Sequence, residues 1–135
     1  MQQALKHLIV VLGPTASGKS NLGVKIAQRF NGEVISADSM QIYRGLDIGT
    51  AKITKEEMGG IKHHLIDIRD PDESFSVSEY QKLARQKIEE IFQRQKTPVL
   101  VGGTGLYINS TLYNYYFADL ADEQQSANNY WRKKY

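Results

Sequence analysis

A glycine-rich loop with one lysine is the segment of this 135-residue sequence best suited to chemistry. It fits the pattern G-x-x-x-x-G-K-[ST] between an apolar run and a helical pattern, the context that this motif needs. The glycines let backbone amides turn inward around an anion, and the amino end of the following helix adds positive charge. Lys19 adds a point charge, and Ser20 can hold Mg²⁺. The loop is therefore predicted to bind a diphosphate or triphosphate through Gly13, Pro14, Thr15, Ala16, Ser17, Gly18, Lys19 and Ser20.

The sequence does not favour hydrolysis of that phosphate. A hydrolase also needs a carboxylate at the end of a hydrophobic strand, where it organises Mg²⁺ and water. The obvious apolar run, 98–101, is followed by Gly102, Gly103 and Thr104, which offer amides and a hydroxyl instead. The loop alone still fits an ATP-dependent small-molecule kinase.

Two residues that follow apolar runs are expected at the same crevice. Asp38 follows the run 34–37, and in a parallel α/β sheet the carboxyl ends of the strands face the ligand crevice. Asp38 could act as a general base or a metal ligand, or only as a turn former or helix cap. Thr104 could hydrogen-bond a phosphate oxygen or a base, and is as well explained as a helix cap.

A histidine pair, His63 and His64, is the remaining candidate for metal binding. Adjacent residues on a strand point to opposite faces, so the two rings cannot chelate one ion together. Ordinary strand or loop histidines are the favoured interpretation.

Strands are predicted where short apolar runs stop at turn residues. The first run is uninterrupted and β-branched, which predicts a strand buried on both faces of a parallel sheet. The predicted strands cover residues 8–12, 34–37, 65–68 and 98–101.

Helices are predicted between these strands. The first shows apolar residues at helical spacing, Leu22, Ile26 and Phe30, and the second begins with a capping box formed by Ser76 and Glu79. The stretch 39–62 predicts only loops and short helical turns. The predicted helices cover residues 19–29, 77–95 and 106–113.

The order strand, phosphate loop, helix, strand is a βαβ unit, which predicts an α/β fold. We expect a P-loop, nucleotide-kinase-like parallel sheet with flanking helices. Four strands are fewer than sheets of this kind commonly have, so the sheet is predicted to be incomplete. Residues 1–117 are assigned to this partial core, and 118–135 to a polar tail that becomes basic and aromatic.

Composition limits the classes of function. With 41% hydrophobic and 24% charged residues, the chain is predicted to bury a core, and a net charge of +2 is compatible with an anionic partner without demonstrating one. The absence of cysteine excludes disulfides, thiolate metal sites and cysteine nucleophiles, and favours a reducing compartment such as the cytoplasm. The longest strongly apolar run, 8–12, is too short for a membrane span or export signal.

Five blocks carry a family resemblance: GPTASGKS at 13–20, ISADSMQIY at 35–43, GLDIGTAK at 45–52, HHLIDIRD at 63–70 and VGGTGLY at 101–107. Together and in this order they closely resemble the tRNA dimethylallyltransferases, also called tRNA isopentenyltransferases. The likeness covers about residues 7–117, and the other blocks are much more specific than the phosphate loop. Ile53 is a minor departure, since the family usually has proline there.

The resemblance implies transfer of a dimethylallyl group from dimethylallyl diphosphate to the N6 amine of the adenosine 3′ to the tRNA anticodon, with release of diphosphate. It implies that the loop 13–20 holds the diphosphate with Mg²⁺ at Ser20. Asp38 is then the base that takes the amine proton, and Thr104 lies in the reaction channel. The anticodon stem-loop is contacted by Asp38, Ser39, Met40, Gln41 and Thr104.

Family members continue well beyond this length, with a helical insertion that grips tRNA. The chain is therefore expected to be the amino-terminal part of such an enzyme, inactive alone, with 118–135 as the start or remnant of that insertion. We further expect a cytoplasmic monomer. The competing hypotheses are the ATP-dependent kinase and a fragment that binds phosphates or RNA without turnover.

Overall fold

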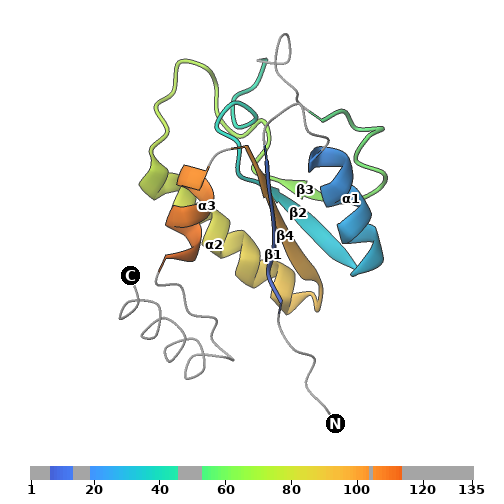
Figure 1. Ribbon diagram of the computed structural model, residues 1–135. Helices are drawn as coiled ribbons and strands as arrows, with labels where there is room; N and C mark the ends of the chain where they lie inside the picture. The colour runs from blue at the N-terminus through green and yellow to red at the C-terminus, as the bar shows by residue number, and fades with distance from the viewer. Residues whose placement is uncertain (1–6, 14–18, 46–52, 104, 114–135) are drawn as a thin grey trace.

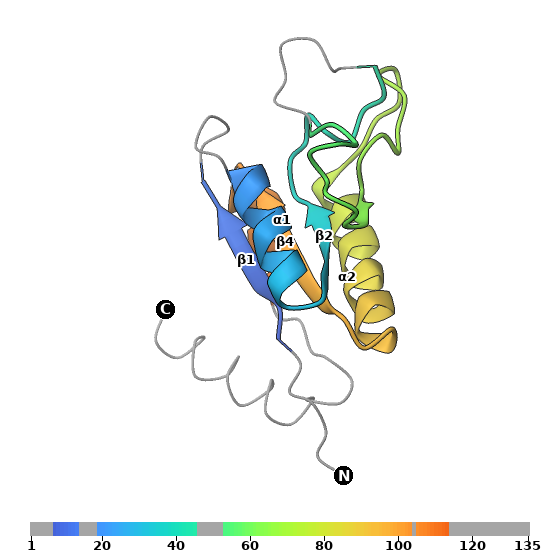
Figure 2. The ribbon, with the colours of Figure 1, turned by 90° about the vertical axis from the view of Figure 1, so that its right-hand side faces the viewer.

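The computed structural model describes residues 7–13, 19–45, 53–103 and 105–113, which form a parallel sheet with helices on both faces (Figures 1 and 2). The α/β class and the flanking helices predicted from the sequence are confirmed. The elements are β1 (Ile9–Leu12), α1 (Lys19–Arg29), β2 (Gly32–Ser36), β3 (His63–His64), α2 (Val77–Gln93), β4 (Thr97–Gly102) and α3 (Gly105–Leu112).

The strands lie in the order β1-β4-β2-β3, and every pairing is parallel. Helix α1 covers one face, where Ala27 packs with Val34 and Val99. Helices α2 and α3 cover the other face, where the core includes Ile35, Leu100 and Ile88. Figure 2 shows α1 and α2 on opposite sides of the sheet.

The prediction that the first strand is buried on both faces is wrong. Within the described part of the chain, β1 pairs only with β4 and lies at an edge of the sheet. Val11 is buried, but Val10 is 38% exposed and Leu12 56% exposed. An apolar run in the sequence does not show whether the strand lies inside the sheet or at its edge.

Helix α1 has the predicted bounds but only part of the predicted buried face. Leu22 and Phe30, two of the three residues that define the predicted apolar stripe, are about half exposed. The third, Ile26, packs against the core of this face, together with the fully buried Ala27. A Cβ on Gly23 would lie 2.7 Å from the Val101 side chain, so the helix also comes close to β4 at this glycine.

The predicted strand 65–68 is also wrong. Leu65 and Asp67 have φ angles of 64° and 57°, in the left-handed region that extended strands do not enter. The strand β3 ends before them, at His64. The backbone that follows binds the segment after β2 instead, with the Asp67 amide donating to the Gln41 carbonyl at 2.9 Å.

The second helix begins as its capping box predicts. The Glu79 amide donates to the Ser76 hydroxyl oxygen at 3.1 Å. The helix ends at Gln93, two residues before the predicted end, because Gln95 has a left-handed φ of 60°.

Candidate functional site

The carboxyl ends of three neighbouring strands, β1, β4 and β2, are joined by hydrogen bonds at one end of the sheet. The Gly13 amide, after β1, donates to the Gly102 carbonyl of β4 at 3.3 Å, and the Ala37 amide, after β2, donates to the Val101 carbonyl at 2.7 Å. A Cβ on Gly102 would lie 2.6 Å from the Ala37 carbonyl oxygen, so only glycine allows the two strand ends to approach this closely. The start of the phosphate loop, the turn after β4 and Asp38 therefore meet here.

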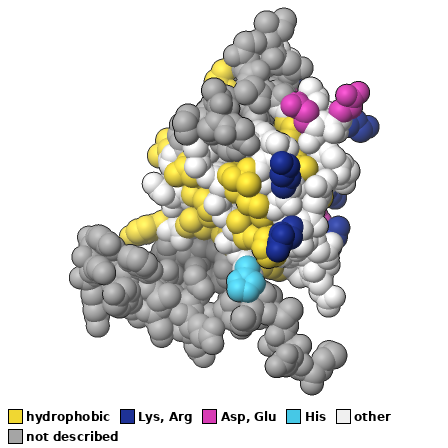
Figure 3. Space-filling model, turned by 45° about the vertical axis from the view of Figure 1, so that its right-hand side comes forward, with side chains coloured by type: hydrophobic (Ala, Val, Ile, Leu, Met, Phe, Trp, Pro, Cys, Tyr) yellow, Lys and Arg dark blue, Asp and Glu magenta, His cyan; other side chains and the backbone are white. Residues whose placement is uncertain are grey.

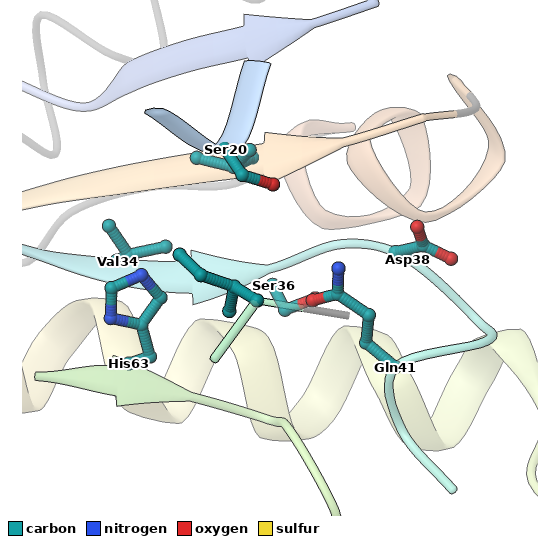
Figure 4. A pocket seen from close by; sticks show the side chains of 8 residues that line it. Ser20, Val34, Ser36, Asp38, Gln41 and His63 are labelled. Atoms are coloured by element: carbon teal, nitrogen blue, oxygen red, sulfur yellow. The ribbon is translucent and has the colours of Figure 1, made fainter. Parts of the chain in front are cut away.

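A pocket opens at the carboxyl ends of these strands, on the face of the sheet that α1 covers (Figure 4). The predicted metal residue Ser20 and the predicted base Asp38 both line it, as a parallel sheet requires. Aliphatic side chains form part of its wall, and a carboxamide and an imidazole add polar groups. The lining residues are Ser20, Val34, Ser36, Asp38, Gln41, Ile53, His63 and Val101.

Asp38 has the turn-forming role that the sequence allowed for it. One carboxylate oxygen, Oδ1, accepts from the Met40 amide at 3.0 Å, and the Asp38 carbonyl accepts from the Gln41 amide at 3.1 Å, so the residue does form a turn. Among the described residues, the other carboxylate oxygen accepts no hydrogen bond. The turn therefore holds one carboxylate oxygen, and the second has no hydrogen-bond partner among the described residues.

The other residues predicted to contact tRNA belong to the same turn. Ser39 and Met40 are exposed, with Met40 49% exposed, whereas Gln41 is 7% exposed. The Gln41 side-chain oxygen accepts a hydrogen bond from the Ser36 hydroxyl at 3.0 Å. The turn thus presents two residues to solvent and one to the pocket.

His63 lines the pocket, although the sequence favoured an ordinary histidine. Its Nδ1 lies 2.8 Å from the Ile61 carbonyl, and because a carbonyl only accepts, Nδ1 carries the proton in the neutral ring. Nε2 is then an unprotonated acceptor. Burial lowers the pKa of His63, which favours this neutral form. Because side chains alternate between the two faces of a strand, the sequence could have indicated that one of the two histidines faces the side of the sheet on which the phosphate loop lies.

His64 confirms the prediction that the pair points to opposite faces. Its Nε2 lies 2.7 Å from the Glu33 carboxylate, which Arg94 also binds at 2.7 and 2.9 Å. Burial opposes the Glu33 charge, but the hydrogen bonds and charges of Arg94 and His64 outweigh it and lower the pKa of Glu33 to about 2. This cluster supports the sheet and lies outside the pocket.

Tyr107 lies close to the site from the other face of the sheet. Its ring stacks on Tyr80 with centroids 4.2 Å apart. Burial, with Tyr43 and Asp38 nearby, raises the pKa of the Tyr107 phenol. The tyrosine that ends the block VGGTGLY thus belongs to the same buried cluster as Ala37 and Ile42, which flank the turn that carries Asp38.

Part of the predicted site lies outside the described residues: Pro14, Thr15, Ala16, Ser17, Gly18 and Thr104, and the Lys19 side chain. The same holds for the tail 118–135. The described residues Gly13 and Ser20 bracket the phosphate loop, at the end of β1 and in the first turn of α1.

The pocket suits Mg²⁺ in the chemistry of its donors. A hydroxyl from Ser20 and a carboxylate from Asp38 line it, and Mg²⁺ prefers oxygen ligands and takes few of them from protein when a phosphate is bound. Across the described ranges, no three His, Asp or Glu side chains are grouped to hold a metal alone. Nor is any helix there both long and apolar enough to cross a bilayer.

Comparison with known proteins places these features in one family. A family model described as IPP transferase matches residues 41–135. A tRNA dimethylallyltransferase of Bacillus pumilus is 62% identical over 119 residues, 88% of this chain and 37% of the relative. A second, from Bacillus subtilis, is 55% identical over 123 residues. The chain thus spans well under half the length of these curated relatives.

Solved structures agree with the sequence matches. A tRNA isopentenylpyrophosphate transferase from Staphylococcus epidermidis is 56% identical with a TM-score of 0.78, covering 88% of this chain and 39% of that one. A eukaryotic dimethylallyltransferase described as acting on tRNA is 40% identical with the same TM-score, covering 84% of this chain and 28% of that one. The described residues therefore have the same fold as these solved structures.

Proposed function

The chain belongs to the IPP transferase family, and we propose that it supplies the diphosphate site and the catalytic base of a tRNA dimethylallyltransferase. The observation that carries the proposal is that Ser20, at the start of the helix after the phosphate loop, and Asp38, whose second carboxylate oxygen has no hydrogen-bond partner among the described residues, line the same pocket. The names of the relatives support the substrate class.

In the proposed reaction, the N6 nitrogen of adenosine attacks C1 of dimethylallyl diphosphate. The C1–O bond breaks, and its electron pair leaves with the diphosphate. The proton of the attacking amine passes to the Asp38 carboxylate. A base held within hydrogen-bond reach contributes ~10² to 10⁴ to the rate.

Gly13 to Ser20 are proposed to bind the leaving diphosphate, with backbone amides around it and Lys19 as a point charge. Ser20 would hold Mg²⁺, which when bound supplies positive charge against the developing charge of the leaving group. Thr104 is proposed to lie in the reaction channel. Asp38, Ser39, Met40 and Gln41 are proposed to contact the anticodon stem-loop of a monomeric enzyme in the cytoplasm.

The test is incorporation of labelled dimethylallyl into an anticodon stem-loop. It uses this chain alone and a hybrid in which the chain replaces the matching part of the Bacillus pumilus relative. A flipped base costs a few kcal/mol, normally offset by a broad basic surface, and this chain has a net charge of only +2. We expect the hybrid to transfer the group and the chain alone only to bind diphosphate. Transfer of labelled γ-phosphate from ATP, with no prenylation, would instead assign the site to a kinase.

Lys19→Ala tests the phosphate loop separately. Loss of a charge-assisted contact should weaken binding of dimethylallyl diphosphate to this chain by ~10- to 100-fold in calorimetry. Lys25→Ala, on the exposed side of the same helix, is the matched control. Equal affinities would remove the loop from the donor site.

A further inference from the structure

Part of the pocket wall is apolar, and the proposed reaction gives this part no role. Val34 of β2, Val101 of β4 and Ile53 line the pocket together with Ser20 and Asp38. The three aliphatic residues are 3%, 7% and 8% exposed, so all of them are buried. Ligand pockets commonly combine such an apolar wall with a few polar groups that fix the orientation of the ligand.

The apolar wall and the proposed base lie along one strand. Side chains alternate between the two faces of a strand, so Val34 and Ser36 of β2 share a face, and Asp38 follows just beyond the end of the strand. Figure 4 shows Val34 and Asp38 at opposite ends of this row, with Ser36 between them. Val34 pairs with His63 of β3, whose neutral ring adds no charge at the apolar end. The pocket is thus apolar toward the interior of the strand and carries its carboxylate at the outer end.

Ile53 differs from the two valines in what surrounds it. Val34 and Val101 belong to the core cluster between the sheet and α1, whereas Ile53 belongs to neither core cluster of the described residues. Its burial is therefore not explained by the core. A change in the size of its side chain should alter the pocket and leave the packing of the sheet intact.

The segment that follows Ile53 is fixed by its own hydrogen bonds. The Thr54 amide donates to Glu57 Oε1 at 2.9 Å, and the Glu57 amide donates to Thr54 Oγ1 at 3.2 Å. The Gln28 side chain of α1 donates to the Gly59 carbonyl at 3.3 Å. Ile53 therefore precedes a closed turn that is anchored on α1, the helix that follows the phosphate loop.

The donor of the proposed reaction has a part for each kind of wall. Its diphosphate is an anion, and its dimethylallyl group is a short branched hydrocarbon chain without a polar atom. With the diphosphate at the phosphate loop and C1 within reach of an amine beside Asp38, the hydrocarbon chain is left to lie against the aliphatic side chains. Contact with them removes the chain from water, which favours binding.

We propose that Val34, Val101 and Ile53 form the subsite for the prenyl chain of the donor, and that Ile53, the member outside the core, limits the length of chain that the site accepts. This inference rests on the proposed function, because it assumes that the phosphate loop holds a prenyl diphosphate.

The test compares the dissociation constants of methyl, dimethylallyl and geranyl diphosphate for this chain, measured by calorimetry with Mg²⁺. The three ligands share the charged group, so the ratios of their constants isolate the contribution of the hydrocarbon. Ile53→Ala should weaken binding of dimethylallyl diphosphate about tenfold and leave methyl diphosphate unchanged, because even one missing methylene in an apolar pocket costs roughly that factor. The same variant should bind geranyl diphosphate more tightly than the wild type, because the space left by the side chain admits more of the longer chain.

Two further variants control this test. Ile68→Ala makes the same change at an isoleucine that packs against the cluster on the other face of the sheet, and should leave all three constants unchanged. Ile53→Val removes a single methylene and should shift the ratios in the same direction by a smaller factor. It decides the matter if thermal melting shows that Ile53→Ala does not fold.

A wild-type chain that binds dimethylallyl and methyl diphosphate equally would overturn the inference. So would unchanged ratios in a folded Ile53 variant. Either result, beside a hybrid that prenylates the anticodon stem-loop, leaves the proposed function intact. A hybrid that binds dimethylallyl diphosphate without transferring the prenyl group would overturn the proposed function itself.

Discussion

The two edges of the sheet are built differently. At the β3 edge, Glu33, His64 and Arg94 form a cluster whose carboxylate and imidazole are almost fully buried. At the β1 edge, Val10 and Leu12 are exposed, and Figure 3 shows apolar side chains gathered on the face that this view presents. An exposed apolar edge strand is a surface on which another strand can pair.

Because of this difference, the two parts of the proposed site follow strands that are packed to different degrees. Asp38 follows β2, which lies between β4 and β3 and is buried along its whole length. The phosphate loop follows β1, which among the described strands has a single neighbour. The proposed base is therefore positioned by a well-packed strand, and the anion-binding loop by a less supported one.

The largest effect on stability is expected at the β3 edge, from Arg94→Ala. Removing the Arg94 guanidinium leaves the Glu33 carboxylate, which is only 3% exposed, without its cation and should lower the free energy of unfolding by about 3–5 kcal/mol. Urea denaturation measures it. Arg44→Ala, which breaks the exposed Arg44–Asp70 pair, is the control and should cost ~1 kcal/mol or less. Equal losses of unfolding free energy in the two variants would show that the buried ion pair at the β3 edge stabilises the protein no more than the exposed one.

Two leucines, one in the inner strand β4 and one in the edge strand β1, give the next comparison. Leu100 in β4 is fully buried, so Leu100→Ala should cost about 2–5 kcal/mol. Leu12 in β1 is 56% exposed, so Leu12→Ala should cost less than ~1 kcal/mol. The same denaturation measurement checks both, and a cost at Leu12 that matches Leu100 would show that the β1 edge is covered in solution.

Acid should weaken the β3 edge selectively. The pKa of Glu33 is lowered to about 2, and burial lowers the pKa of His64 despite the nearby carboxylate. Both groups bind protons more readily in the unfolded chain, so their contribution to stability is present above the unfolded pKa values and is lost as pH falls. For Glu33 the loss spans about pH 4.5 to 2 and amounts to at most ~3 kcal/mol. Glu33→Gln should remove this part of the pH dependence, and a variant with the wild-type profile would contradict the assignment.

Local signals in the sequence predicted the elements well. The phosphate-loop pattern placed the start of α1 at Lys19, and Ser76 with Glu79 placed the start of α2, because loop and cap chemistry act within a few residues. The strand β4 extends one residue beyond its predicted range, 98–101, at each end, because a short apolar run that stops at glycines is a local signal as well. The place of Asp38 at the pocket could be predicted because the carboxyl ends of parallel strands lie at the same end of the sheet.

Features set by distant parts of the chain were missed. Nothing in the run 8–12 shows that β4 is its neighbour and that no second strand of the described residues pairs with it. The end of β3 at His64 depends on the contact of Asp67 with Gln41, which strand propensity does not report. The place of His63 in the pocket depends on which face of β3 meets α1, and that face is fixed by tertiary packing.

The most direct test of the central claim is the single-turnover rate of dimethylallyl transfer by the hybrid with Asp38→Asn. The amide keeps the shape of the side chain and can still accept from the Met40 amide, but it cannot take the amine proton. We expect both substrates to bind as before and the transfer step to slow by ~10² to 10⁴. A near-normal rate would contradict the account and leave Asp38 with only the turn that it forms.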